Sequence, residues 1–156
     1  KKNLENLNSN NIELFLINAA ISDKEGEVEF IPGDISTRGY ISSVNFKSNA
    51  TSKKNINTVK AFSIDRLFKD YSIKKCKILK IDCEGAEYEI IYKMNVELLQ
   101  KVENIFLEIH PVCGKSKIDL INYIKKNGFL VKYDKFQNGC LELYAIKNTS
   151  NESYLS

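Results

Sequence analysis

Residues 77–89 decide the fold of this chain, and they read Lys77-Ile78-Leu79-Lys80-Ile81-Asp82-Cys83-Glu84-Gly85-Ala86-Glu87-Tyr88-Glu89. A short apolar run that ends in an acid and a glycine, followed by Ile90 and Ile91 at helical spacing, predicts a strand, a turn and a helix. In open α/β sheets ligands bind at the carboxyl ends of strands. The sequence therefore predicts an α/β fold with a polar site directly after strand 78–81.

A second strand is predicted at residues 105–110, and it ends in His110, the single histidine of the chain. Two neighbouring parallel strands bring their carboxyl ends to one edge of a sheet. We therefore expect one site that gathers the acids and the histidine of both strand ends. These residues are Asp82, Glu84, Glu87, Glu108 and His110.

These motifs together resemble the paired signature of the FkbM-family S-adenosylmethionine-dependent methyltransferases. The first half is Lys80-Ile81-Asp82, then Glu84-Gly85-Ala86-Glu87, and the second half is Leu107-Glu108-Ile109-His110. Upstream, Asn18 to Gly26 followed by Val28-Glu29-Phe30 is similar to the segment that this family places after its third strand. Three motifs in one order are more specific than any one of them alone.

The resemblance implies a Rossmann-like class I methyltransferase sheet, mostly parallel, that ends in an antiparallel hairpin. Members of the family begin with a strand and a glycine-rich turn for the cofactor, but this sequence holds no Gly-x-Gly. We therefore expect the C-terminal part of such a domain, without its first two strands. S-adenosylmethionine is the implied cofactor, and we expect this chain to bind it weakly or not at all.

One partial domain is predicted over residues 1–147, with a polar excursion at 32–57 and a frayed tail at 148–156. The apolar patterns predict strands at 13–17, 27–31, 58–62, 78–81, 105–110, 129–133 and 140–146. Helices are predicted after Ser63, over 85–94 and after Ser116, with Leu67, Phe68 and Tyr71 buried in the first and Ile118, Ile121 and Ile124 sharing one face of the last.

Composition excludes several classes of protein. A net charge of +3 with scattered lysine pairs does not indicate nucleic-acid binding, and no apolar run approaches the ~20 residues of a membrane span. The four cysteines lack C-x-x-C spacing, which favours reduced structural thiols in a cytoplasmic protein.

The residue types suggest roles at the site. His110 has an unperturbed pKa suited to a general base, and Asp82 is the alternative base. Hydrogen bonding of His110 to a nearby carboxylate at a strand end is the structural alternative, and for Glu87 a helix N-terminal charge is favoured over a site role. The resemblance implies that Asn18 and Ala19 border the adenine, that Asp82 faces the methionine end of the cofactor, and that Glu84 and Glu108 orient substrate or base.

The predicted function is methyl transfer from S-adenosylmethionine to a hydroxyl of a sugar or other polyhydroxyl metabolite, with a small-molecule or glycan acceptor. The alternatives are a non-enzymatic fragment and a module that binds a divalent metal. A hard divalent cation would suit acids and a histidine, but the pattern is not specific for one, and we expect no metal.

The missing strands also predict an unpaired sheet edge. We expect strand 13–17 to pair in a different order, or the edge to pair with a second copy or an N-terminal companion segment. The four-strand unit from Ile78 to Ile146 should form in either case.

Overall fold

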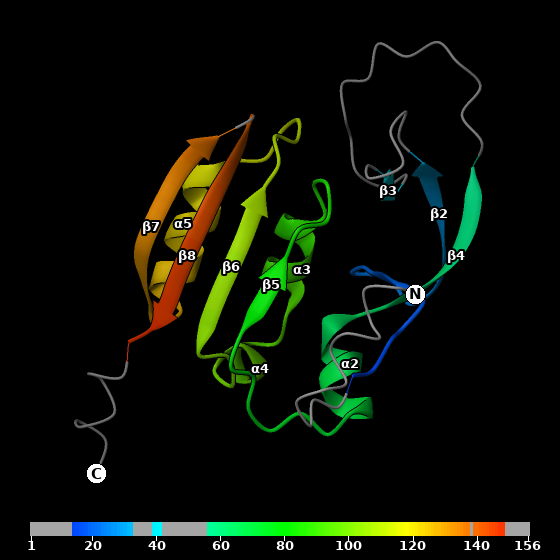
Figure 1. The fold of residues 1–156 in the computed structure, drawn as a ribbon, viewed down its shortest axis with the longest axis horizontal. Coiled ribbons are helices and arrows are strands. Elements are labelled where there is room, and N and C mark those ends of the chain that lie inside the picture. The colour runs from blue at the N-terminus through cyan, green and yellow to red at the C-terminus, as the bar shows by residue number, and fades with distance from the viewer. Residues whose placement is uncertain (1–13, 33–38, 42–55, 138, 149–156) are drawn as a thin grey trace.

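The computed structural model describes residues 14–32, 39–41, 56–137 and 139–148. These residues form two four-stranded sheets with helices between and beside them (Figure 1). None of the helices in this described part has the length and hydrophobicity to cross a bilayer.

The second sheet carries the strand ends on which the site was predicted. Its strands have the order β5-β6-β8-β7. Strands β5 and β6 are parallel, whereas β8 runs antiparallel to both β6 and β7. The predicted parallel pair and the predicted C-terminal hairpin are therefore both confirmed. The bounds are β5 Leu79–Ile81, β6 Asn104–Ile109, β7 Phe129–Gln137 and β8 Cys140–Lys147.

Helices cover one face of this sheet. Helix α3 (Glu87–Lys93) packs on β6 and helix α5 (Lys117–Lys126) packs on β7, and both lie behind the sheet in Figure 1. The alternation of β6 explains the packing, because its odd-numbered residues are buried while Phe106 is exposed. Each buried aliphatic side chain contributes about 1.5–3 kcal/mol relative to an exposed one.

Side-chain caps begin two helices at the predicted residues. Helix α2 (Ile64–Asp70) follows Ser63, whose hydroxyl accepts a hydrogen bond from the Arg66 amide. Ser116 caps α5 in the same way through the Asp119 amide. Each cap satisfies an amide that has no partner within the helix, which is worth about 1 kcal/mol. A short helix α4 (Val96–Leu99) connects α3 to β6.

Two predicted helix faces need correction. In α2, Phe68 is buried, but Tyr71 is exposed at the C-terminal end. In α5, Ile124 and Leu120 are fully buried, whereas Ile118 is 70% exposed. The predicted face is therefore confirmed at Ile124 and at Ile121, which packs against the core, and wrong at Ile118, while Leu120 is buried in addition.

The first sheet has the order β1-β4-β2-β3. Strand β1 is parallel to β4, and the pairs β2–β4 and β2–β3 are antiparallel. The α/β class is thus confirmed, but the described residues form two mixed sheets rather than one mostly parallel sheet. The bounds are β1 Ala20–Ile21, β2 Gly26–Pro32, β3 Gly39–Ile41 and β4 Asn57–Phe62.

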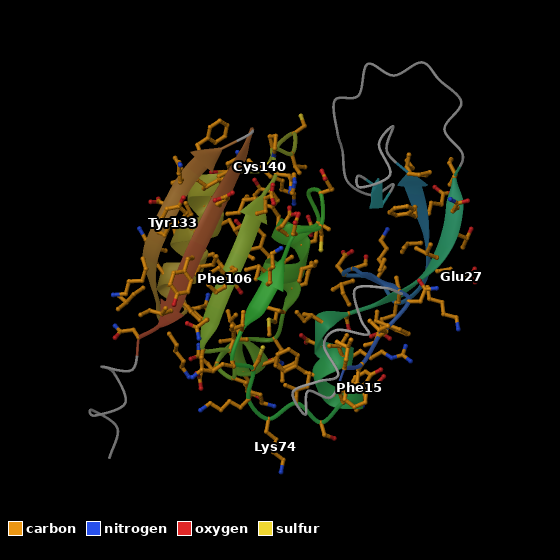
Figure 2. All side chains as sticks on the ribbon, in the orientation of Figure 1. Phe15, Glu27, Lys74, Phe106, Tyr133 and Cys140 are labelled. Atoms are coloured by element: carbon orange, nitrogen blue, oxygen red, sulfur yellow. The ribbon has the colours of Figure 1, made fainter. Side chains whose placement is uncertain are left out.

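The prediction of a strand at Glu13–Ile17 is wrong for residues 14–17, which are the described ones. Residues 14–17 have no strand pairing, and Leu16 is 70% exposed. Phe15 lies edge-on against Tyr71 next to α2, with ring centroids 5.8 Å apart (Figure 2). An apolar run supplies a tendency to be buried, but a strand also needs a ladder, and β4 pairs with Ala20 and Ile21 instead. Residues 14–17 therefore do not pair with another strand of the described residues, and pairing of the sheet edge with a second copy or an N-terminal companion segment stays a prediction.

Much of the predicted excursion at 32–57 lies outside the described residues, as does the tail from 149. Within the excursion, β3 pairs with the end of β2.

Candidate functional site

The polar site lies where β5 and β6 end. Because these strands are parallel, the turn that follows Ile81 and the residue that follows Ile109 meet at one edge of the sheet. The turn leads directly into α3, whose first residue is Glu87. His110 follows the last residue of β6.

Glu87 is the centre of the site. Its carboxylate has no exposed surface and accepts hydrogen bonds from the amides of Cys83 at 2.8 Å and Gly85 at 2.9 Å. The same carboxylate lies 2.9 Å from Nδ1 of His110. One buried side chain therefore closes the strand-end turn and fixes the histidine of the neighbouring strand.

Backbone geometry in the turn makes these bonds possible. Gly85 has φ +103° and Glu84 has φ +47°, so the chain turns back and both amides point at the Glu87 carboxylate. A non-glycine residue in the left-handed region costs about 1–2 kcal/mol. Glu84 is thus held in a strained conformation at the site.

His110 is buried, with 6% of its surface exposed, and its Nε2 edge faces acids. Nε2 lies 3.4 Å from a carboxylate oxygen of Glu84 and 3.9 Å from one of Glu108. The hydroxyl of Tyr88 donates a hydrogen bond to the His110 carbonyl at 3.1 Å. Both the ring and the backbone of this histidine are therefore held in place.

These contacts set the pKa of His110. Burial disfavours the imidazolium, but the hydrogen bond and charge of Glu87, together with the charges of Glu84 and Glu108, outweigh it. The pKa of His110 is therefore raised above its ordinary value of about 6.5.

The same surroundings keep two neighbouring groups protonated. Burial raises the pKa of the Cys83 thiol to about 11, and the charge of Glu87 adds to that shift. Burial likewise raises the pKa of Tyr88 to about 12, again with a contribution from Glu87. Tyr88 can therefore donate its proton to the His110 carbonyl over the physiological pH range.

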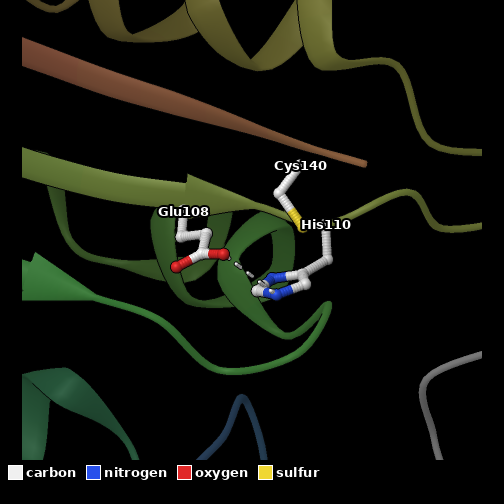
Figure 3. Close-up of side chains that lie close together, drawn as sticks. All are labelled: Glu108, His110 and Cys140. Carbon is white, nitrogen blue, oxygen red and sulfur yellow. Dashed lines mark ion pairs between the residues drawn. The ribbon is translucent and has the colours of Figure 1, made fainter. Parts of the chain in front are cut away.

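Cys140 also reaches the site, from the first residue of β8. Ile109 pairs with Leu141 across β6 and β8, so Cys140 lies beside His110. The sulfur, an imidazole nitrogen and a Glu108 oxygen all lie within 4.8 Å of one another (Figure 3). Burial raises the pKa of this thiol, and the charges of Glu108 and Glu84 raise it further.

The structure brings together Glu84, Glu108 and His110, as the sequence predicted. It does not bring Asp82 into contact with the histidine. The carboxylate of Asp82 is 39% exposed and lies 3.8 Å from the ammonium of Lys80. Asp82 therefore sits at the expected strand end, but outside the hydrogen-bonded cluster.

The positions of Asn18 and Ala19 need correction. They were expected at the end of a strand, but both precede β1, which begins at Ala20. The Ala19 amide bonds to the carbonyl of Ile17, so this segment is a local turn into the strand. Their predicted contact with the cofactor stays a prediction.

Sequence reasoning undervalued Glu87 and missed Tyr88 and Cys140. An acid in the first turn of a helix ordinarily stabilises the helix dipole, and nothing local distinguishes Glu87 from such a residue. Cys140 is brought in by the register of the hairpin on β6. The hairpin signal itself was visible, but the alignment of β8 against β6 was not.

The face of the second sheet that no described helix covers continues from this site. An open depression of about 340 Å³ lies next to Glu108, between Lys80 of β5 and Tyr133 of β7. The rings of Phe106 and Tyr144 stack in this depression, with their centroids 4.4 Å apart. Two residues that line the depression, Phe106 and Tyr133, are labelled in Figure 2.

Comparison with known proteins agrees with the motifs of the site. The Methyltransferase FkbM domain family matches residues 1–131. The hexuronic acid methyltransferase AglP of Haloferax volcanii is 29% identical over 116 residues, which cover 74% of this chain and 45% of that protein. The chain thus spans about half the length of this curated relative. No solved structure matches this chain.

The family match covers most of the chain and includes both strand ends that form the site. This protein therefore belongs to the FkbM methyltransferase family.

Proposed function

We propose that this chain belongs to an S-adenosylmethionine-dependent O-methyltransferase that methylates a hydroxyl group of a sugar. The observation that carries the proposal is the buried Glu87–His110 hydrogen bond at the joint end of β5 and β6, in a chain of this family. The relative AglP is named as a hexuronic acid methyltransferase, which favours an acidic sugar as the acceptor.

His110 is the proposed general base. A hydroxyl must lose its proton as the methyl group arrives, and a fixed imidazole can accept that proton. Glu87 holds Nδ1, so Nε2 is the nitrogen left to receive the proton. The same carboxylate stabilises the imidazolium that results.

Glu84 and Glu108 are proposed to orient the acceptor. Their carboxylates flank Nε2 of His110 and can accept hydrogen bonds from neighbouring sugar hydroxyls. Such bonds hold the reacting hydroxyl in line with the base, which is a large part of catalysis in transfer reactions.

The described residues fit the cofactor in part. When bound, S-adenosylmethionine supplies an electrophilic methyl group. The exposed carboxylate of Asp82 is placed at a strand end where it can bind the α-ammonium group of such a molecule. Asn18 and Ala19 are the proposed adenine contacts, and they rest on the family resemblance alone.

A pair of variants tests the assignment of the base. In a version of the chain extended by the two N-terminal strands that the family resemblance implies, His110→Ala should lower the rate of methyl transfer to a hexuronic acid about 10²–10⁴-fold, while the affinity for S-adenosylmethionine changes little. Asp82→Asn should weaken cofactor binding instead. Unchanged turnover in His110→Ala would remove this residue from the mechanism.

Calorimetric titration of the 156-residue chain with S-adenosylmethionine tests the cofactor separately. We expect weak or no binding by this chain, and micromolar binding by a longer polypeptide made by adding the two N-terminal strands that the family resemblance implies. If the longer polypeptide also fails to bind, the proposed methyl transfer is wrong and the site serves another purpose.

A further inference from the structure

We propose that Glu108, His110 and Cys140 form a binding site for one transition-metal ion, with Zn²⁺ as the best match. The three residues come from the end of β6 and the start of β8, and their ligand atoms lie within 4.8 Å of one another (Figure 3). Nothing in the methyl-transfer chemistry requires Cys140. The inference therefore goes beyond the proposed function.

The geometry is close to that of an occupied site. Zinc lies about 2.3 Å from sulfur and about 2.0–2.2 Å from nitrogen or oxygen, so tetrahedral ligand atoms are roughly 3.5 Å apart. The observed spacing requires an approach of about 1 Å, which side-chain rotation of Glu108 and Cys140 can supply. The carboxylate of Glu84 lies 3.4 Å from Nε2 of His110 but outside this group of three, so it would have to move to become a fourth ligand.

The histidine is oriented as metal ligands usually are. Metal-binding histidines donate their second ring N–H to a carboxylate or carbonyl group, which fixes the ring and the tautomer. Here Glu87 lies 2.9 Å from Nδ1 and is itself held by two backbone amides. Nε2 is consequently free of Glu87 and faces the carboxylates of Glu84 and Glu108.

The charge of the cluster favours a cation independently of its geometry. Three carboxylates surround one imidazole, and the ion pairs of Glu84 and Glu108 within the described residues are made with His110 alone. With these carboxylates ionised, the cluster carries excess negative charge even around a protonated imidazole, with Glu87 buried and Glu84 and Glu108 partly exposed. A divalent ion would neutralise it.

The ligand types select the class of metal. Acids and a histidine alone would suit a hard cation such as Mg²⁺, which was the alternative that the sequence suggested. A cysteine sulfur in the set excludes Mg²⁺ and Ca²⁺ as preferred ions and favours Zn²⁺ or Co²⁺. Cys140 therefore changes the expected chemistry of the site.

Metal binding would exclude the base function. A metal on Nε2 occupies the lone pair that would otherwise accept the hydroxyl proton. We therefore expect Zn²⁺ to inhibit methyl transfer in the active polypeptide. The proposal itself is tested by metal binding, so it can fail or succeed without the methyltransferase assignment.

Cobalt provides the direct test, because Co²⁺ bound to a thiolate gives a near-ultraviolet charge-transfer band. The reduced, metal-free 156-residue chain is titrated with Co²⁺, and we expect the band to saturate at one equivalent and to disappear when Zn²⁺ is added. Cys140→Ser should abolish the band. Cys113→Ser is the matched control, because Cys113 is exposed and lies outside the cluster, and it should retain the band.

Two further variants separate ligand loss from misfolding. Glu108→Gln should weaken Zn²⁺ binding at least tenfold, and Glu87→Gln should weaken it about 10–100-fold through the orientation of His110. Circular dichroism checks that each variant is folded. A wild-type chain without the band, a band that persists in Cys140→Ser, or unchanged affinity in folded Glu108→Gln would each overturn the proposed site.

Discussion

The carboxylate of Glu87, fully buried in the first turn of α3, lies 2.9 Å from Nδ1 of His110 at the end of β6. This contact joins two segments that are 23 residues apart in sequence. It also joins the two halves of the family signature, since one half supplies the acid and the other supplies the histidine. One buried contact between an acid and a histidine therefore connects the two halves of the signature.

The titration of His110 provides the first prediction. His110 is the single histidine of the chain, so its ring protons give one unambiguous NMR signal. With a chelator present, we expect a midpoint above the ordinary value of about 6.5. Glu87→Gln should lower the midpoint, and Glu108→Gln should lower it less, because Glu108 is farther from the ring. A wild-type midpoint at or below the ordinary value would contradict this account.

The raised pKa of His110 also predicts how the stability of the protein depends on pH. A histidine whose pKa is raised by folding stabilises the native state fully below its unfolded pKa of about 6.5, and that contribution is lost as the pH rises through the folded pKa. The groups that face the ring are Glu84, Glu87, Glu108 and Cys140. Urea unfolding at a series of pH values above 6.5 should show a decline in stability.

The control for this decline is a pair of variants. His110→Gln should flatten it, because no group then changes protonation at this position. Glu29→Gln, on an exposed position of β2, should keep the wild-type slope. An equally steep decline in His110→Gln would assign the effect to another group.

The strained backbone of Glu84 gives the third prediction. Glu84→Ala and Glu84→Gly both remove the carboxylate, but only glycine adopts φ +47° without cost. We therefore expect the glycine variant to be more stable than the alanine variant by about 1 kcal/mol. Denaturant unfolding of the two proteins measures the difference. If alanine is the more stable of the two, the turn does not store strain at this residue.

The sequence was sufficient to predict the parts of the fold that depend on local signals. Ser63 and Ser116 cap their helices, and the hairpin forms around Gly139, because caps and turns are set by neighbouring residues. The apolar run at residues 14–17 failed as a strand because its pairing depends on a partner far away in the sequence. Local pattern does not contain that information.

The candidate site likewise contains residues that local sequence signals predict and residues that depend on the tertiary structure. Glu84, Glu108 and His110 were found because they occupy the ends of strands that were themselves predictable. Glu87 was undervalued because burial of a charged residue depends on the tertiary structure, and Cys140 was missed because it arrives through strand register. The residues that tertiary packing and strand register bring into the site were thus harder to predict than those that lie at the strand ends.

Packing of α5 gives the fourth prediction, with both variants in one helix. Leu120 is fully buried, so Leu120→Ala should destabilise the protein by about 2–5 kcal/mol. Ile118 is 70% exposed, so Ile118→Ala should change stability by less than about 0.5 kcal/mol. Thermal unfolding distinguishes them. Similar losses from both variants would mean that this helix packs on the face first expected from the sequence.

The face of the second sheet opposite helices α3 and α5 gives the last prediction. Phe106 and Tyr144 are directly opposite on β6 and β8, and their rings are nearly parallel at 4.4 Å. Stacked pairs of this kind are worth about 0.5–1.5 kcal/mol beyond the area that they bury. A double-mutant cycle with Phe106→Ala and Tyr144→Ala should therefore give a coupling energy in that range.

Two controls define the outcome of this cycle. Tyr144→Phe keeps the ring and loses only the hydrogen bond from its hydroxyl to Asn104, so coupling to Phe106 should persist. Phe106→Ala and Ile118→Ala lie on different elements without a shared contact, so their effects should add within about 0.5 kcal/mol. If the Phe106–Tyr144 coupling is no larger than this, the two rings lie side by side without stabilising the sheet. The face would then be held by the β6–β8 ladder alone.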